Sequence, residues 1–341
     1  MRAAQYHSPG QPLAINDVAK PVIGTGEVLV RITASGVCHS DLRLIDGTED
    51  PVADYGATLP ITLGHENAGT VAEIGERVIG LAVGDAVAVY GAWGCGACPV
   101  CRSGEEQQCD VRRWVGVGRD GGYAEYLRVP AARHLIPLAG LDPVEAAPLT
   151  DAGVTPYRAI RRCLSVLAPG TSLVVIGVGG LGHMAVQIAK AVTPGTVVMA
   201  VDVTDERLQL ASEVGADEVV DGRGDAAEEI MRRSDGAGAR AVIDLVGSDE
   251  TLGLANAVVG PGGVIVLAGG AGGGLDYRWH FGEATVTSTT WGSLSDLAAV
   301  LQLAKLGRVQ CRIERFPLEA INEVLARLER GEILGRAVVI P

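Results

Sequence analysis

The feature that most constrains the fold is a glycine-rich turn between an apolar run and a helical pattern. The run SLVVIG (172–177) has no polar alternation, as expected of a strand buried on both faces. GVGGLG (177–182) follows, and residues 183–192 then show helical spacing. A second apolar run, TVVMAVDV (196–203), completes a strand–helix–strand unit. Such a unit predicts two parallel strands joined by a crossover helix.

The same alternation continues further along the chain. RLQLASEVGAD again has a helical pattern, and RAVIDLVG (240–247) and GGVIVLAGG (262–270) repeat the strand signal. Alternating strands and helices of this length predict an α/β fold with a parallel, doubly wound sheet covered by helices.

The glycines of the turn have the spacing of a dinucleotide-binding site. Gly177 permits the tight turn, Gly179 lets a pyrophosphate approach the backbone, and Gly182 lets helix and strand pack closely. The turn also contains Gly180 and Leu181, and the helix that follows offers its N-terminus to the phosphates. The alternative is that these glycines only end a strand of a doubly wound sheet.

An acidic residue indicates which dinucleotide is bound. Asp202 ends the second strand, where a carboxylate hydrogen-bonds the ribose hydroxyls of NAD and repels a 2′-phosphate. Arg207 is nearby, but no arginine follows Asp202 at once. We therefore expect NAD rather than NADP.

The first part of the chain has a different pattern. Residues 27–37, 67–75 and 84–91 form short strand-like runs separated by Gly and Pro, without regular alternation of strands and helices. The last 50 residues contain an amphipathic helical pattern, LEAINEVLARLERG, and a terminal strand pattern, RAVVIP. The composition therefore changes near residues 150 and 290.

Four of the seven cysteines, at positions 95, 98, 101 and 109, have the spacing C-x2-C-x2-C-x7-C. Four thiolates within one loop predict a closed tetrahedral zinc site, and an iron–sulfur cluster or nonspecific thiols are the alternatives. Ferredoxin-like runs continue with C-x3-C-P, which this loop does not. Because four ligands leave no open position, the site is expected to be structural.

The expected cellular setting follows from charge and hydropathy. A net charge of −13 disfavours nucleic acid and anionic membranes as partners. The N-terminus lacks the apolar core of a signal peptide, and no apolar run reaches 18 residues. We expect a cytoplasmic protein, where thiols stay reduced and clustered cysteines bind metal.

A second metal-competent set is scattered through the sequence. Cys38 in GVCHSDL, His65 in LGHENAG and Asp151 in PLTDAGVTPY each lie beside a glycine or a turn. A Cys, a His and a carboxylate would leave a fourth zinc position open, as in catalytic sites. Taken singly, each has another interpretation: a core cysteine, a buried polar histidine, and an aspartate that caps a helix. Spacing alone does not decide between them.

Together these motifs resemble the medium-chain zinc-dependent alcohol dehydrogenases. GHENAG resembles the zinc signature of that family, CHSD its first ligand loop, CGACPVC…C its structural zinc lobe, and GVGGLG…VD its coenzyme fold. TDAGVTPY resembles the bacterial secondary-alcohol branch, in which Asp is the third ligand. The resemblance also includes the terminal LGRAVVIP and extends over essentially the whole chain.

The resemblance implies two domains. A discontinuous, β-rich, GroES-like catalytic domain would comprise residues 1–148, with the structural zinc lobe, and 289–341, and a Rossmann domain that binds NAD would comprise 149–288. The active site would lie in the cleft between them. Bacterial members are often tetramers, so we expect a homotetramer or a homodimer.

The resemblance also assigns roles at the metal. Cys38, His65 and Asp151 would hold a catalytic zinc, which lowers the pKa of a bound alcohol so that the alkoxide passes a hydride to NAD. With the four cysteines this makes two zinc ions per chain. Glu66 would approach the metal during ligand exchange, or serve instead as the buried partner of an arginine. Asp41 would orient His65.

A proton must leave the alcohol. By resemblance Ser40 takes it and passes it to the nicotinamide ribose. Many relatives have a histidine three residues further on, whereas here Arg43 occupies that position and cannot accept a proton. His39 is the nearest histidine, although its counterpart in the family more often faces the cofactor phosphates. The end of the relay is therefore open.

Further residues are assigned to the cofactor and the substrate. Arg336 resembles the C-terminal arginine that contacts the cofactor phosphate, with a surface charge as the alternative. Backbone at later strand ends would approach the nicotinamide, at Gly247, Ala268 and Gly269. Tyr55 and Trp291 are candidates for an apolar substrate wall, although core packing explains an aromatic residue equally well.

The resemblance implies a zinc- and NAD-dependent dehydrogenase acting on secondary alcohols and ketones. A relative acting on polyols, primary alcohols or aldehydes is the alternative within the family. A noncatalytic nucleotide- or zinc-binding relative is the alternative outside enzymes, and the intact ligand sets disfavour it.

Overall fold

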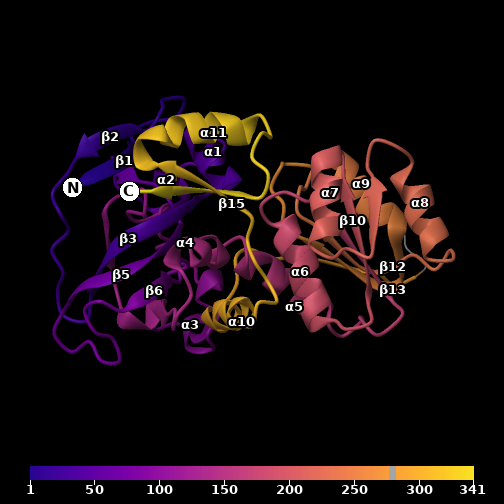
Figure 1. Ribbon diagram of the computed structural model, residues 1–341, viewed down its shortest axis with the longest axis horizontal. Helices are drawn as coiled ribbons and strands as arrows, with labels where there is room; N and C mark the ends of the chain where they lie inside the picture. Colours follow the sequence, from indigo (N-terminus) through magenta and orange to yellow (C-terminus); the bar gives the residue numbers. More distant parts are fainter. Residues whose placement is uncertain (276–281) are drawn as a thin grey trace. The chain divides into compact units, whose positions relative to one another are not determined.

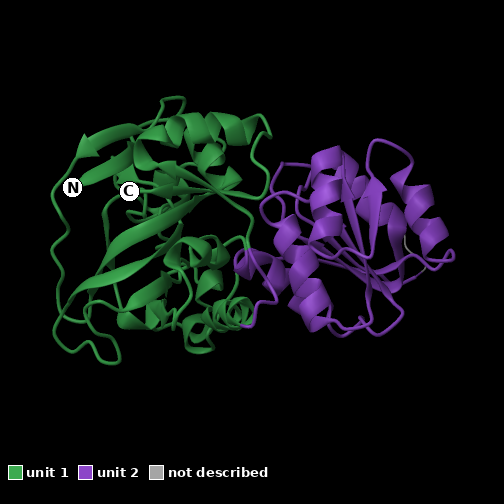
Figure 2. Ribbon diagram, viewed as in Figure 1, with its two compact units in different colours: residues 1–152, 292–305, 311–341 green, residues 153–291, 306–310 purple. Residues whose placement is uncertain are grey.

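The computed structural model describes residues 1–275 and 282–341 of the chain. This part forms two compact units (Figure 2). Unit 1 comprises Met1–Ala152, Gly292–Lys305 and Cys311–Pro341, and unit 2 comprises Gly153–Trp291 and Leu306–Gln310. The units differ from the expected domains at residues 149–152, 289–291 and 306–310. As a result Asp151 belongs to the same unit as Cys38 and His65, whereas the expected limits had separated them.

Unit 2 contains a six-stranded parallel sheet, with the strand order β11-β10-β9-β12-β13-β14 among the described residues. This confirms the predicted doubly wound sheet. Figure 1 labels β10, β12 and β13 of this sheet. The strands are β9 (Ser172–Ile176), β10 (Val197–Asp202), β11 (Glu218–Asp221), β12 (Ala239–Asp244), β13 (Val259–Leu267) and β14 (Thr285–Ser288). The helices are α5 (Val154–Cys163), α6 (Gly182–Val192), α7 (Asp205–Glu213), α8 (Ala226–Arg233) and α9 (Asp249–Val258).

The core of unit 2 lies between the sheet and its helices. Val174, Met199, Val242 and Ile265 come from the four central strands, and Ile230 of α8 packs against them; all are buried. Burying such a side chain contributes roughly 1.5–3 kcal/mol. The helices α5, α6 and α7 pack in sequence, and α8 packs on α9, as expected when right-handed crossovers place helices on both faces.

Unit 1 contains two sheets. The smaller has the order β2-β1-β4, and the larger has the order β15-β16-β3-β5-β6-β8, with β7 also paired to β3. The strands are β1 (Arg2–Tyr6), β2 (Ala14–Asp17), β3 (Val28–Val37), β4 (Ile61–Thr62), β5 (Glu66–Ile74), β6 (Ala86–Val89), β7 (Tyr126–Val129), β8 (Leu135–Pro137), β15 (Ile313–Pro317) and β16 (Arg336–Ile340). The α-helices are α1 (His39–Ile45), α2 (Pro51–Tyr55), α3 (Pro99–Arg102), α4 (Pro143–Ala146), α10 (Leu294–Lys305) and α11 (Ile321–Glu329).

The pairing of β3 places the site of unit 1. Its last residues pair with β5 on one side, where Gly36 is opposite Glu66, and with the C-terminal strand β16 on the other, where Ala337 is opposite Val37. Both pairs are antiparallel, so the ends of β3, β5 and β16 that meet carry Cys38, Glu66 and Arg336. A Cβ at Gly36 would overlap the carboxylate of Glu66, so only glycine leaves room for that side chain.

Among the helices that the structure describes, none combines the length and the apolar character needed to cross a bilayer.

Candidate active site and metal centres

The three scattered residues come together in unit 1. Cys38 follows β3, His65 precedes β5, and Asp151 follows the 3-10 helix η3 (Pro148–Thr150). Asp151 Oδ2 lies 3.6 Å from Cys38 Sγ and 3.7 Å from His65 Nε2. Ligand atoms around a tetrahedral zinc are about 3.3–3.8 Å apart, given the usual zinc–ligand distances. The spacing and chemistry of these three donors therefore fit a zinc ion.

His65 also faces a second carboxylate. Asp41 is fully buried, and its Oδ1 lies 3.4 Å from Nδ1 of His65, while Oδ2 accepts a hydrogen bond from the backbone N–H of Cys38 at 3.0 Å. Burial alone would lower the pKa of His65, but Asp41 and Asp151 raise it well above its usual value. Burial alone would raise the pKa of Asp151, but the hydrogen bond and the charge of His65 outweigh burial and lower this pKa below its usual value. The structure thus brings Asp41 beside the imidazole, and its role in orienting His65 stays a prediction.

Glu66 and Arg336 form a buried ion pair beside these ligands. Arg336 Nε donates to Glu66 Oε2 at 3.0 Å, Nη2 contacts Glu66 Oε1, and Nη2 also lies 3.3 Å from Asp151 Oδ2. Both side chains are almost inaccessible to solvent. Burial raises the pKa of Glu66 to about 7, although Arg336 opposes this shift. The structure thus matches the alternative of a buried arginine partner for Glu66, and Arg336 is not a surface charge.

The residues expected in the proton relay lie on α1. Ser40 Oγ lies 3.6 Å from Cys38 Sγ, and His39 is exposed. Arg43, at the position where many relatives have histidine, donates from Nε to Glu49 at 2.8 Å. The structure therefore brings Ser40 to the cysteine ligand, and the roles of Ser40 and His39 stay predictions.

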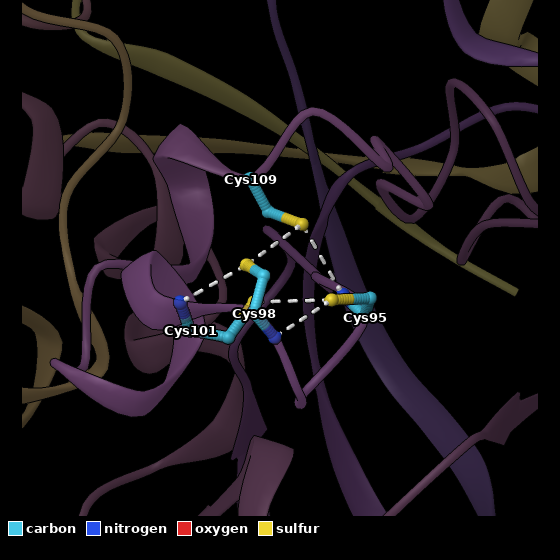
Figure 3. Close-up of side chains that lie close together, drawn as sticks. All are labelled: Cys95, Cys98, Cys101 and Cys109. Atoms are coloured by element: carbon cyan, nitrogen blue, oxygen red, sulfur yellow. Dashed lines mark hydrogen bonds between the residues drawn. The ribbon is translucent and has the colours of Figure 1, made fainter.

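The four cysteines of the lobe converge on one point (Figure 3). The Sγ atoms of Cys95 and Cys101 are 3.9 Å apart, and those of Cys98 and Cys109 are 3.8 Å apart. No disulfide joins them, since all seven cysteines are free. The backbone N–H groups of Ala97 and Cys98 point at Cys95 Sγ and lower its pKa to about 6, which favours the thiolate that binds metal. This donor set fits a closed zinc site.

A carboxylate from the lobe anchors it to the rest of unit 1. Glu106 accepts hydrogen bonds from the backbone N–H of Gly94 at 3.0 Å and from Arg133 Nε at 3.0 Å, and it lies 3.2 Å from His134 Nε2. Burial alone would raise the pKa of Glu106, but its hydrogen bonds to His134, Arg133 and Gly94 lower it to about 2. Glu106 therefore stays ionised and joins the entry of the lobe to its exit.

The glycine-rich turn of unit 2 has the geometry that a dinucleotide needs. Gly177 has φ +89°, and a Cβ on Gly182 would overlap the carbonyl oxygen of Gly177. A Cβ on Gly179 would meet nothing within 4 Å, so this glycine faces open space, as the second glycine of the motif should. Leu181 is the N-cap residue of α6, with Gly180 before it. The turn therefore fits a pyrophosphate at the helix N-terminus.

Asp202 ends β10 beside this turn. One carboxylate oxygen accepts from the backbone N–H of Val178 at 2.7 Å, and the other accepts from Val203 at 2.8 Å. Arg207 Nη1 lies 3.9 Å from Asp202 Oδ1. These contacts hold the carboxylate at the carboxyl edge of the sheet, where the ribose of a dinucleotide is bound in such folds.

Comparisons with known proteins agree with this geometry. The alcohol dehydrogenase GroES-like domain matches residues 24–140, and the zinc-binding dehydrogenase domain matches residues 180–305. An NAD-dependent alcohol dehydrogenase of Sulfurisphaera tokodaii is 42% identical over the whole of both chains. The chain belongs to the medium-chain zinc-dependent alcohol dehydrogenase family.

Other members of this family are also similar. The crystal structure of the alcohol dehydrogenase from Aeropyrum pernix has a TM-score of 0.94 and 39% identity, with both chains fully covered. A D-arabinose 1-dehydrogenase (NADP(+)) of Saccharolobus solfataricus is 38% identical over 100% of this chain and 97% of that protein. Family membership makes the chain an alcohol dehydrogenase-type oxidoreductase with zinc and NAD as the expected cofactors, and it leaves the substrate class open.

The later strand ends of this family member form a second backbone cluster. Gly247 has φ +77°, and a Cβ there would lie 2.6 Å from the carbonyl oxygen of Gly269. Ala268 and Gly269 both donate their backbone N–H to the carbonyl oxygen of Asp244. The carboxylate of Asp244 accepts from Val246 and Gly247. Asp244 thus organises the turn that was expected to face the nicotinamide, and no motif in the sequence pointed to Asp244.

Tyr55 and Trp291 lie in different units. The Tyr55 hydroxyl donates to Glu49 at 2.9 Å, and its ring lies 5.6 Å from the ring of Trp114 in unit 1. Trp291 is buried and ends the first segment of unit 2. Their role as a substrate wall stays a prediction.

Proposed function

We propose that this protein interconverts secondary alcohols and ketones with NAD as the hydride carrier and two zinc ions per chain. The observation that carries the proposal is the convergence of Cys38, His65 and Asp151, which are donors of three kinds at zinc-like spacing. Glu66 belongs to the same cluster, but its carboxylate is paired with Arg336. Three protein ligands leave one position for a substrate oxygen, as in catalytic zinc sites.

The chain's own residues would act as follows. Cys38, His65 and Asp151 would hold the zinc, which when bound polarises the carbon–oxygen bond of the substrate. Asp41 keeps the His65 ring in place. Ser40, next to Cys38 Sγ, would accept the proton of the alcohol and pass it on. Arg336 neutralises part of the charge of Glu66 and Asp151, and we keep the cofactor phosphate as its second proposed partner.

The second zinc would be structural. The four cysteines satisfy a tetrahedral ion, and Glu106 connects the two ends of their loop. The proposal of two zinc ions rests on these two separate ligand sets.

NAD is proposed over NADP because of Asp202. The buried carboxylate of Asp202 would repel a 2′-phosphate. Arg207, 3.9 Å from this carboxylate, neutralises only part of its negative charge. The similarity of the NADP(+)-dependent D-arabinose dehydrogenase means that relatedness alone does not decide the cofactor.

The same relative supports a second candidate, a sugar or polyol dehydrogenase. The two are separated by kinetics of the zinc-loaded protein with secondary alcohols, primary alcohols, polyols and aldoses, each with NAD and NADP. We expect the highest kcat/KM for a secondary alcohol with NAD, and Cys38→Ser serves as the inactive control. A preference for an aldose or polyol would favour the second candidate, and a preference for NADP would overturn the role given to Asp202.

For the setting of the enzyme, we propose a homodimer or homotetramer in the cytoplasm with only a small-molecule substrate as partner. Light scattering of the purified protein tests the assembly, and a monomeric mass would contradict it.

A further inference from the structure

A buried tyrosine contacts the carboxylate that faces the histidine ligand. Tyr123 is completely buried in unit 1, and its hydroxyl lies 2.7 Å from Asp41 Oδ2. The chain around it is fixed by backbone hydrogen bonds, from Tyr123 N–H to Leu63 and from Ala4 N–H to Tyr123. Neither the zinc motifs nor the glycine-rich turn includes this residue.

The ring of Tyr123 also lies against the backbone next to His65. Gly64, which precedes His65, has φ +96°, and a Cβ there would lie 2.6 Å from Cδ1 of Tyr123. Glycine at this position therefore allows the aromatic ring to pack on the segment that carries the ligand. The ring and the hydroxyl of Tyr123 thus contact both the approach to His65 and its carboxylate partner.

Asp41 is the point where these contacts meet. Its Oδ2 accepts from Tyr123 Oη and from the backbone N–H of Cys38, and its Oδ1 faces Nδ1 of His65 at 3.4 Å. A fully buried carboxylate needs such donors, because it has lost its water. Two donors on Oδ2 fix the plane of the carboxylate and so direct Oδ1 to the imidazole.

The tyrosine hydroxyl has one hydrogen and two acceptors within reach. The carbonyl oxygen of Gly36 is 3.2 Å away, and Asp41 Oδ2 is closer at 2.7 Å. A charged acceptor makes the shorter and stronger hydrogen bond, so the Tyr123 hydroxyl donates its hydrogen bond to Asp41.

We propose that Tyr123 is a positioning residue for the metal centre, which acts through Asp41 to hold the His65 ring with Nε2 toward Cys38 and Asp151. The inference rests on the proposed zinc at these ligands. Outer partners of a metal-bound histidine fix its ring and its tautomer, and their loss commonly weakens metal binding by about 10- to 100-fold. Tyr123 extends that support by one residue beyond Asp41.

The test is Tyr123→Phe, which keeps the ring and removes only the hydroxyl. The matched control is Tyr90→Phe, because Tyr90 is also buried in unit 1 and, among the described residues, its hydroxyl has only neutral acceptors, the carbonyl oxygen of Gly292 at 2.9 Å and Gln107 Oε1 at 3.3 Å. Zinc release to excess EDTA is followed with a colorimetric zinc indicator in the wild type and both variants. Circular dichroism and the second, four-cysteine zinc report whether each variant is folded.

We expect Tyr123→Phe to release the zinc of Cys38, His65 and Asp151 roughly 10- to 100-fold faster than the wild type does. The zinc of the four cysteines should leave Tyr123→Phe at the wild-type rate, and Tyr90→Phe should release the zinc of Cys38, His65 and Asp151 at the wild-type rate. In an Asp41→Asn background, Tyr123→Phe should add less than about twofold, because the tyrosine acts through that carboxylate.

Wild-type release of both zinc ions from Tyr123→Phe would overturn the inference, and so would effects of Tyr123→Phe and Asp41→Asn that multiply. If Tyr123→Phe does not fold, Tyr123→Trp and Tyr123→Leu are each made in the wild type and in Asp41→Asn. Zinc release that is accelerated equally in both backgrounds would show that Tyr123 does not act through Asp41, and would refute the inference. A wild type with only the four-cysteine zinc would instead contradict the proposed function.

Discussion

Removing the charge of Arg336 should destabilise unit 1 in a way that depends on pH. In Arg336→Met the guanidinium that contacts Glu66 and Asp151 is replaced by an apolar chain, and Glu66 stays fully buried. Breaking one partner of a buried ion pair costs about 3–5 kcal/mol, because the remaining charge is desolvated and unpaired.

The pH dependence follows from the pKa of Glu66. Burial already raises this pKa to about 7 with Arg336 present, and losing the arginine raises it further. A carboxyl whose folded pKa lies above its unfolded value of about 4.3 stabilises the fold when protonated, and the folded protein loses stability as pH rises toward the folded pKa. One such group changes the free energy of unfolding by about 1.4 kcal/mol per pH unit, or at most about 2.7 kcal/mol between pH 6 and 8 in the variant. The wild-type group, with its pKa of about 7, already loses about 1.4 kcal/mol over this range, so the variant should lose at most about 1.4 kcal/mol more than the wild type.

The assay is equilibrium urea denaturation of the metal-free wild type and metal-free Arg336→Met at pH 6 and pH 8, because the pKa of Glu66 refers to the site without zinc. The expected destabilisation of the variant is larger at pH 8. Arg330→Met is the control, since Arg330 pairs with Glu332 on the surface and should show no measurable loss at either pH. A loss for Arg336→Met below about 1 kcal/mol, or an equal loss at both pH values, would refute the buried-pair account.

Four further substitutions test separate parts of the structure. Cys98→Ser should leave about one zinc per chain and lower Tm, with turnover lost only as the protein unfolds; turnover lost before any change in Tm would contradict a structural lobe. Asp202→Asn should raise the NADPH-to-NADH ratio of kcat/KM roughly tenfold, about 1.4 kcal/mol, and an unchanged ratio would remove Asp202 as the discriminating residue. Ser40→Ala should lower kcat roughly 10²- to 10⁴-fold, whereas His39→Gln should have a smaller effect that grows at low pH; an unchanged pH profile would exclude His39 from the relay.

Strands buried on both faces were predictable from local sequence. β9, β10, β12 and β13 are apolar runs without alternation, and each was expected close to its observed position. β11 and β14 were not, because β11 has only four residues with acidic ends and β14 is largely exposed at the sheet edge. Neither presents the apolar signal that marks a buried strand.

The two metal sites differ in how well local sequence patterns predict them. The spacing of four cysteines within one loop predicts their convergence, because the chain between them is short. Cys38 and Asp151 are far apart in sequence, so only a fold or a family resemblance could join them. Tyr123 and Asp244 are single polar residues whose importance comes from hydrogen bonds to distant segments. The pairing of β16 with β3 likewise places Arg336 beside Glu66, which no local pattern predicts.

The central claim is that Cys38, His65 and Asp151 hold a zinc ion on which turnover depends, separate from the zinc of the four cysteines. Inductively coupled plasma mass spectrometry of the purified wild type and Cys38→Ser, with turnover measured on the same samples, tests it most directly. The account predicts about two zinc ions per chain in the active wild type, and about one in a folded, inactive Cys38→Ser. One zinc ion in the wild type, together with an active Cys38→Ser, would contradict it.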